Sequence, residues 1–136
     1  MKNSLTAIFL FLSGFLLLGI GGTILLFPHA FYANDGILLG NDPSLLSEIR
    51  ASGGLLAGSS LVILFGTFRT TLRSLVVAIT IFVYGSFGTS RLLGMALDGM
   101  PSNGLVIATA IELIIAALGI MILCCQPLER YSNNSN

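Results

Sequence analysis

The sequence predicts an all-α, polytopic membrane protein whose single domain, residues 1–136, is a bundle of four transmembrane helices. Of the 136 residues, 54% are hydrophobic and only 9% are charged, and the mean hydropathy is +0.95. Soluble domains have about 45–50% apolar and about 25% charged residues, and one of this size could not bury so much apolar surface. Four apolar runs have the roughly 20 residues that a helix needs to cross a hydrocarbon core about 30 Å thick.

The first two spans are delimited by proline. Pro28 closes the first span, which is too long for the apolar region of an ordinary signal peptide and is expected to be retained. The second run becomes continuously apolar at Ala51, but its helix should begin at Pro43, because Asp42 is a good N-cap and proline suits the first helical position. We therefore expect these two spans at residues 5–27 and 43–68.

The third and fourth spans are expected at residues 75–97 and 103–125. A helix-breaking string at residues 98–102 separates them, and Pro127 ends the fourth. Since lipid offers no hydrogen bonds to the backbone, apolar runs of this length must be helices. The remaining segments are an outer loop at residues 28–42 and a polar, disordered tail at residues 127–136.

Charged residues near the span ends predict the orientation. Four basic residues fall on one side of the bundle: Lys2, Arg69, Arg73 and Arg130. Three acidic residues fall on the other side: Asp35, Asp42 and Asp98. Because basic residues favour the cytoplasmic side, both termini are predicted to be cytoplasmic.

Several classes of function are excluded or disfavoured by composition. Six basic residues balance six acidic ones, so the basic excess that nucleic-acid binding requires is missing. No Cys and His residues have the spacing of a zinc site, and no phosphate-binding glycine fingerprint is present, so neither a metal nor a cofactor is predicted. Cys124 and Cys125 suit packing at the membrane edge better than disulfide formation, and His29 suits an interfacial polar position.

Three ionisable residues lie at a similar depth within three different spans: Arg50, Arg91 and Glu112. At 1.5 Å per residue, each is about 9–11 Å from the outer end of its span. A charge at such depth costs about 2.5–3.5 kcal/mol on insertion scales, so it usually faces the bundle interior and is paired. The three side chains are therefore expected to meet between the helices.

The helical faces that carry these residues agree with this expectation. Glu112 shares a stripe of mostly small residues with Thr109, and Tyr84 shares a face with Arg91. Arg50 is aligned with Gly54 and Gly58, a small-xxx-small pair that lets helices approach closely and could also mediate self-association. We predict an ionic cluster that opens toward the outer face: Arg50, Arg91 and Glu112, with Glu48 and Asp98 nearer the surface and Tyr84 and Thr109 beside them.

Two interpretations of this cluster are open. It could serve only to hold the helices in register, as buried ion pairs do in other proteins. Alternatively, two guanidinium groups against one deep carboxylate leave room for a further negative group, such as that of a lipid, a quinone or another anionic or carbonyl-bearing amphiphile.

One short string carries a family resemblance. The sequence LSEIRA at residues 46–51 is followed by Gly53-Gly54, and later by Arg91 and by DGMP at residues 98–101. Together these resemble a family of small bacterial four-helix membrane proteins catalogued as a domain of unknown function, similar in layout to the DoxX-like group. The resemblance implies a multi-pass protein of the bacterial inner membrane and supplies no activity. DoxX-like proteins are linked to quinone or thiol redox partners, whereas this chain has no Cys-x-x-Cys pair and no histidine within its spans.

The function that the sequence favours is a non-enzymatic binding or accessory bundle, because the loops are short and no soluble domain is present. Its expected partners are membrane lipids, with a larger membrane complex or a homodimer as further possibilities. One alternative is an intramembrane enzyme that uses Glu112 as a base. Another is a small dimeric transporter in which Glu112 carries a proton.

Overall fold

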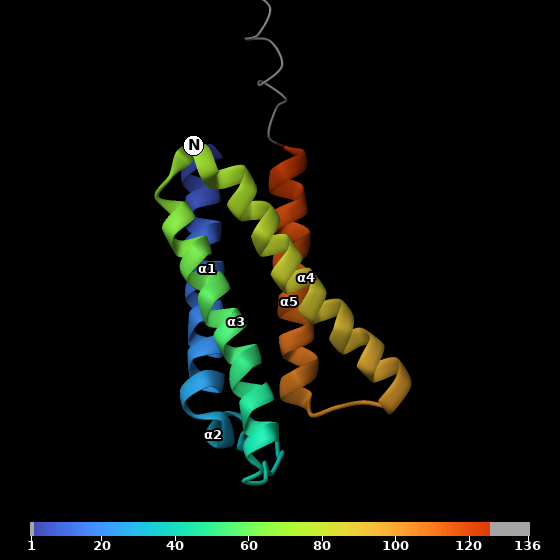
Figure 1. Cartoon of the computed structure of the whole chain (residues 1–136). Helices are drawn as coiled ribbons and strands as arrows, with labels where there is room; N and C mark the ends of the chain where they lie inside the picture. Colours follow the sequence, from blue (N-terminus) through green and yellow to red (C-terminus); the bar gives the residue numbers. More distant parts are fainter. Residues whose placement is uncertain (1, 126–136) are drawn as a thin grey trace, which may run out of the picture.

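The computed structural model describes residues 2–125, and in this part of the chain every regular element is a helix (Figure 1). The elements follow in the order α1 (Lys2–Leu26), α2 (Pro28–Ala33), α3 (Pro43–Thr67), the 3₁₀ helix η1 (Thr70–Leu72), α4 (Arg73–Asp98) and α5 (Asn103–Cys124). The all-α prediction is confirmed. The predicted tail at residues 127–136 lies outside the described residues.

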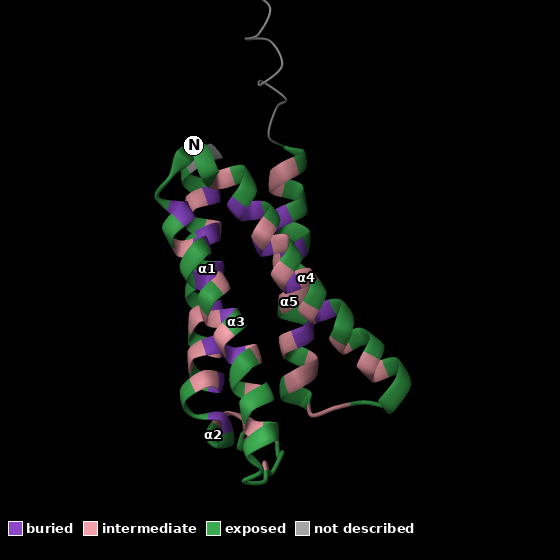
Figure 2. Ribbon diagram, viewed as in Figure 1, coloured by how far each residue is buried: buried purple, intermediate pink, exposed green. Residues whose placement is uncertain are grey.

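The four long helices α1, α3, α4 and α5 are each long and apolar enough to cross a membrane, as predicted. Their outward faces are covered by large apolar side chains that neighbouring helices leave exposed, whereas the buried residues face the other helices (Figure 2). Examples from the four helices are Phe15, Leu55, Phe82 and Ile107. So extensive an apolar surface suits lipid rather than water, and the chain is a multi-pass membrane protein.

Helix ends follow the predicted chemistry. The Asp42 carboxylate caps α3 by accepting hydrogen bonds from the backbone N–H groups of Ser44 at 2.8 Å and Leu45 at 3.0 Å. Ser102 caps α5 through its Oγ, which accepts from the N–H of Leu105 at 3.3 Å. After α4, Gly99 adopts a φ of +98°, a conformation that favours glycine and that ends the helix.

The outer segment between α1 and α3 differs from the predicted loop at residues 28–42. A short helix, α2, begins with Pro28 directly after Phe27. Proline stabilises the first turn of a helix, because its φ is already helical and the missing N–H would have no partner there. Phe31 and Tyr32 of α2 are half-buried, with their rings edge to face at 5.5 Å between centroids.

The helices associate as two pairs. Helix α1 packs along α3 and α4 packs along α5, and the two pairs meet mainly through α4 (Figure 1). Tyr84 of α4 is buried and donates a hydrogen bond from its hydroxyl to the carbonyl of Ser13 on α1, at 2.6 Å. This bond ties one pair to the other.

Two glycines set the distance between α1 and α3. A Cβ atom at Gly21 would lie 2.5 Å from the backbone nitrogen of Ala57, and one at Gly53 would lie 2.7 Å from that of Leu25. The two backbones therefore touch directly, which any larger residue would prevent. The prediction that Gly54 and Gly58 provide the close approach is wrong. A Cβ at Gly54 would have its nearest neighbour at 4.0 Å, and one at Gly58 would meet nothing within 4 Å.

The start of α1 and the end of α5 lie at the same end of the bundle, together with the η1 turn (Figure 1). At this end Arg69 lies over the ring of Phe65, 5.6 Å from its centroid. The opposite end carries α2 and the beginnings of α3 and α5, and we call it the outer end. The assignment of the first end to the cytoplasm stays a prediction.

Candidate ligand-binding site

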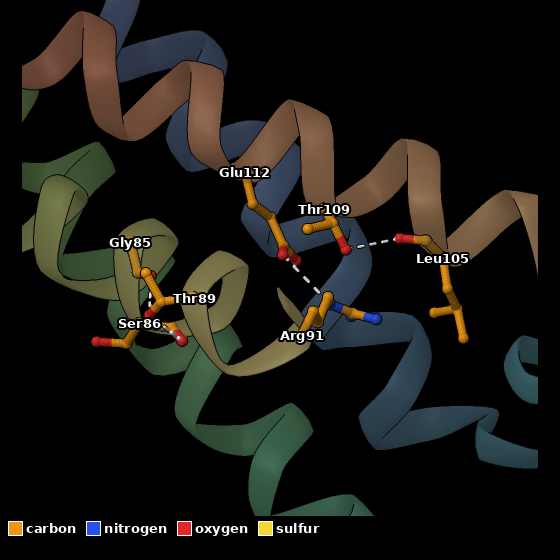
Figure 3. Close-up of polar contacts among 7 residues, drawn as sticks. All are labelled: Gly85, Ser86, Thr89, Arg91, Leu105, Thr109 and Glu112. Carbon is orange, nitrogen blue, oxygen red and sulfur yellow. Dashed lines mark hydrogen bonds and ion pairs between the residues drawn. The ribbon is translucent and has the colours of Figure 1, made fainter. Parts of the chain in front are cut away.

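An ion pair joins α4 to α5 in the outer half of the bundle. Nε of Arg91 lies 3.2 Å from Oε2 of Glu112 (Figure 3), and the two side chains are 28% and 12% exposed. The structure thus brings together two of the three deep ionisable residues that the sequence singled out. Their charges neutralise each other at a depth where a lone charge would be costly.

Small residues around the pair let α4 and α5 approach closely. On α5, Thr109, Ala116 and Gly119 share the buried face that also carries Glu112. On α4, a Cβ atom at Gly88 would lie 2.8 Å from the Leu113 side chain. The predicted small-residue stripe on the fourth span therefore faces the interior and carries Glu112 with it.

The ion pair leaves part of the arginine without a protein partner. Arg91 Nε and Glu112 Oε2 are both buried and form no hydrogen bond of good geometry, so the charge–charge contact is what holds them. Figure 3 shows the guanidinium extending away from Glu112 toward Leu105. Among the described residues, none accepts a hydrogen bond from its terminal nitrogens. An arginine has five N–H donors, so this group can still bind oxygen atoms.

A cavity of about 140 Å³ lies between the two helix pairs, and we call it the inner cavity. All five α-helices contribute to its wall, which is mostly apolar and includes Ile24, Phe31, Leu56, Tyr84, Arg91 and Glu112. A single water needs only about 10–15 Å³ of such volume. The inner cavity is therefore large enough for several waters or for the apolar part of a small molecule.

A second, more open depression of about 240 Å³ runs between the outer ends of α4 and α5, and we call it the outer groove. Its lining includes Arg91, Gly94, Asp98, Pro101, Leu105 and Thr109. Arg91 and Leu105 also line the inner cavity. The arginine thus stands at the boundary between the inner cavity and the more open outer groove.

Arg50 does not join this pair. Its side chain is exposed and donates a hydrogen bond to the backbone carbonyl of Leu25 at the end of α1, and no ion pair among the described residues links it to Glu112. The expectation that all three charges meet is therefore wrong. The reason is rotational position: Arg50 is one turn before Gly53, so it shares the face of α3 that α1 covers.

The other predicted site residues occupy separate places. Glu48 is exposed near the start of α3, away from the ion pair. Tyr84 lines the inner cavity, although its hydroxyl binds Ser13 rather than Arg91. Thr109 is buried, lines the outer groove and donates to the carbonyl of Leu105 at 2.8 Å. Asp98 lines the same groove.

Residues that sequence reasoning missed are the apolar lining of the inner cavity and the contribution of α2. Leu17 and Ile20 of α1 face the cavity. The sequence could not indicate this, because apolar residues of a membrane helix occur both on the lipid-facing side and in the interior. The helix that carries Phe31 and Tyr32 could have been predicted, because Pro28 suits a first helical position and is followed by residues that can continue a helix.

The remaining candidate residues for metal binding or thiol chemistry are the cysteines, the histidine and the carboxylates. Within residues 2–125, no group of three or more His, Cys, Asp or Glu side chains is placed to hold a metal ion. Cys124 and Cys125 are exposed free thiols, and His29 is exposed at the outer end.

A polar tether connects the segment after α2 to the start of α5. Ser102 donates from its Oγ to the Asp35 carboxylate at 2.8 Å, while the same Oγ caps α5. Loss of an N-cap costs about 1 kcal/mol, so Ser102→Ala should lower the free energy of unfolding by at least that amount. Hydrogen exchange at the first turn of α5 should accelerate. Ser102→Thr, which keeps the hydroxyl, is the control, and equal exchange in all three proteins would contradict the tether.

The family model of DUF4345, a domain of unknown function, matches residues 5–123. No curated protein matches the chain, and no solved structure does. The matched range includes nearly all of the four long helices, both partners of the ion pair and the lining of both depressions. The chain therefore belongs to the DUF4345 family.

Proposed function

We propose that this protein is a non-enzymatic membrane bundle that binds a small amphiphile, such as a lipid or a quinone. An anionic or carbonyl oxygen of the ligand binds the terminal nitrogens of Arg91, and its apolar part enters the inner cavity. The observation that carries the proposal is the position of Arg91, which borders both depressions with terminal nitrogens that no described residue binds.

Energetic reasoning supports an oxygen ligand at this arginine. A guanidinium that has left water is stabilised by a forked pair of hydrogen bonds to a carboxylate or phosphate. The contact with Glu112 is made through Nε, so the edge formed by the two terminal nitrogens remains for a ligand. Hydrogen bonds to a charged group contribute about 1.5–3 kcal/mol each, so an oxygen bound to the terminal nitrogens would add measurably to the affinity of the ligand.

The location that we propose is the inner membrane of a bacterium, with both termini in the cytoplasm and the outer groove open to the outer leaflet. The basic residues around η1, Arg69 and Arg73, support this orientation, because positive charge near span ends favours the cytoplasmic side. The layout similar to DoxX-like proteins is part of the same proposal. Membrane lipids, a larger membrane complex or a second copy of the chain would be its partners.

The competing explanation is that the ion pair only holds α4 against α5. A thermal-unfolding assay distinguishes this explanation from ligand binding. The protein is measured in lipid-free mild detergent, with short-chain phosphatidylglycerol and a soluble quinone as probes. A bound ligand at 100 times its Kd stabilises the folded state by about 2.7 kcal/mol. We expect at least one probe to stabilise the wild type and to lose most of this effect in Arg91→Ala.

Arg69→Ala is the matched control, because it removes one positive charge at the other end of the bundle. Arg91→Lys retains the charge but lacks the planar fork, so it should bind more weakly than the wild type while remaining folded. Equal stabilisation of the wild type and Arg91→Ala would contradict the proposal and leave a purely structural ion pair.

A further inference from the structure

The outer groove contains a second charged residue, Asp98, that the ion pair does not use. Asp98 is the last residue of α4, is exposed, and forms no hydrogen bond or ion pair with any residue that the structure describes. A carboxylate at the C-terminal end of a helix is unfavourable, because the helix dipole is negative there. Stability of α4 therefore does not explain an aspartate at this position.

The balance of charge around the groove points to the kind of ligand it would take. Arg91 contributes one positive charge, and Glu112 already opposes it at 3.2 Å. Asp98 adds a negative charge, and Arg50, bound to Leu25 on α1, is not there to offset it. The site therefore has a net negative charge, which a purely anionic ligand would increase and a ligand with an additional cationic group would relieve.

The groove has space between its two charges. Arg91 and Asp98 are seven residues apart, which is two helical turns on one face and about 10 Å along the axis. Gly94 lies between them and lines the groove. A Cβ atom at Gly94 would meet nothing within 4 Å. The part of the outer groove between Arg91 and Asp98 is thus not filled by a side chain at position 94.

We infer that the ligand is a zwitterionic amphiphile, with its anionic group on Arg91 and its ammonium group on Asp98. The chemical class is an aminophospholipid, which places a phosphate and a primary ammonium in one headgroup, and part of one acyl chain would enter the inner cavity. This inference rests on the proposed function. It makes Asp98 a specificity-determining residue and Gly94 the residue that keeps the headgroup site open.

The test compares short-chain phosphatidylethanolamine with phosphatidylglycerol of the same acyl length, added to the full chain in lipid-free mild detergent. Native mass spectrometry gives the Kd of each lipid. The wild type should bind phosphatidylethanolamine at least tenfold more tightly than phosphatidylglycerol. In Asp98→Asn this preference should disappear, with phosphatidylglycerol bound as well as or better than by the wild type.

A steric variant tests the same site without altering charge. Gly94→Leu should weaken binding of both lipids at least tenfold, whereas Gly22→Leu, another helical glycine with open space around it, should leave both affinities unchanged. Circular dichroism and gel filtration verify that each variant is folded.

Outcomes that overturn this inference differ from those that overturn the proposed function. Equal or tighter binding of phosphatidylglycerol by the wild type, or an unchanged preference in Asp98→Asn, refutes the zwitterionic ligand while leaving an anion-binding Arg91. Unchanged binding of both lipids in Arg91→Ala refutes the proposed function itself.

Discussion

The substitution Gly21→Ala is expected to lower the free energy of unfolding by about 1–3 kcal/mol or more, which is the range for overpacking a well-packed interior. The added Cβ would lie 2.5 Å from the backbone nitrogen of Ala57 and 2.9 Å from the carbonyl oxygen of Gly53. Backbone atoms cannot rotate aside as a side chain can, so α1 and α3 would have to separate. Gly53→Ala should have a similar effect, because its Cβ would meet the backbone of α1.

Neighbouring glycines supply the controls for this prediction. Gly22→Ala and Gly54→Ala change the same residue type one position further along each helix, where a Cβ would meet nothing closer than 4.0 Å. Alanine is favoured over glycine inside a helix by about 0.5–1 kcal/mol, so these variants should be neutral or more stable. Unfolding of all four variants in mixed micelles measures the difference. Equal stability of Gly21→Ala and Gly22→Ala would refute direct backbone contact between α1 and α3.

The second large effect is expected at the ion pair. Glu112→Leu leaves the Arg91 guanidinium without its countercharge in the wall of the inner cavity. Removing one partner of a buried pair costs about 3–5 kcal/mol, and the 28% exposure of Arg91 places the expected loss near the lower end of that range. Arg91→Met should be similarly destabilised, because it leaves Glu112 unpaired.

The double variant Arg91→Met/Glu112→Leu should recover most of this loss, since no unpaired charge remains and an apolar pair fits an apolar wall. A double-mutant cycle from unfolding free energies gives the coupling between the two residues. Arg69→Met combined with Glu112→Leu serves as the reference, because these residues are at separate places in the bundle and their effects should add. Additive effects of Arg91→Met and Glu112→Leu would show that the ion pair contributes no coupling.

Hydropathy and helix-end chemistry were sufficient to predict the class of the protein and its four long helices. The carboxylate of Asp42 caps α3 immediately before Pro43, as the residue types indicated. These features are local, because a cap or a proline acts on its own turn of helix. The short helix α2 was missed because its first residue, Pro28, was interpreted only as the end of the preceding span.

The candidate site was predicted in part, and the limit is geometric. Counting residues from a span end gives the depth of a charge, and on that basis Arg50 matched Arg91 and Glu112. Depth does not determine which neighbouring helix a side chain faces. Arg50 shares the face of α3 that contacts α1, so it binds the Leu25 carbonyl instead. The small-residue stripe around Glu112 did carry rotational information, and that prediction agreed with the structure.

Close contacts between glycines could not be assigned from a single sequence. Gly21 and Gly22 are adjacent and chemically identical, yet only Gly21 touches the backbone of α3. The rotation of each helix about its axis decides between them, and this rotation depends on the fit of all the side chains in the interface. For the same reason, the sequence alone could not distinguish Gly53, which touches the backbone of α1, from its neighbour Gly54.

The pairing of α1 with α3 and of α4 with α5 determines how the inner cavity can adapt. Both partners of the ion pair belong to one helix pair, and both close-contact glycines belong to the other. The width of the chamber between the pairs is set instead by contacts that join them, which are the hydrogen bonds of Tyr84 to Ser13 and of Ser102 to Asp35. A change in those two hydrogen bonds would alter the chamber while leaving the Arg91–Glu112 contact, which lies within one pair, in place.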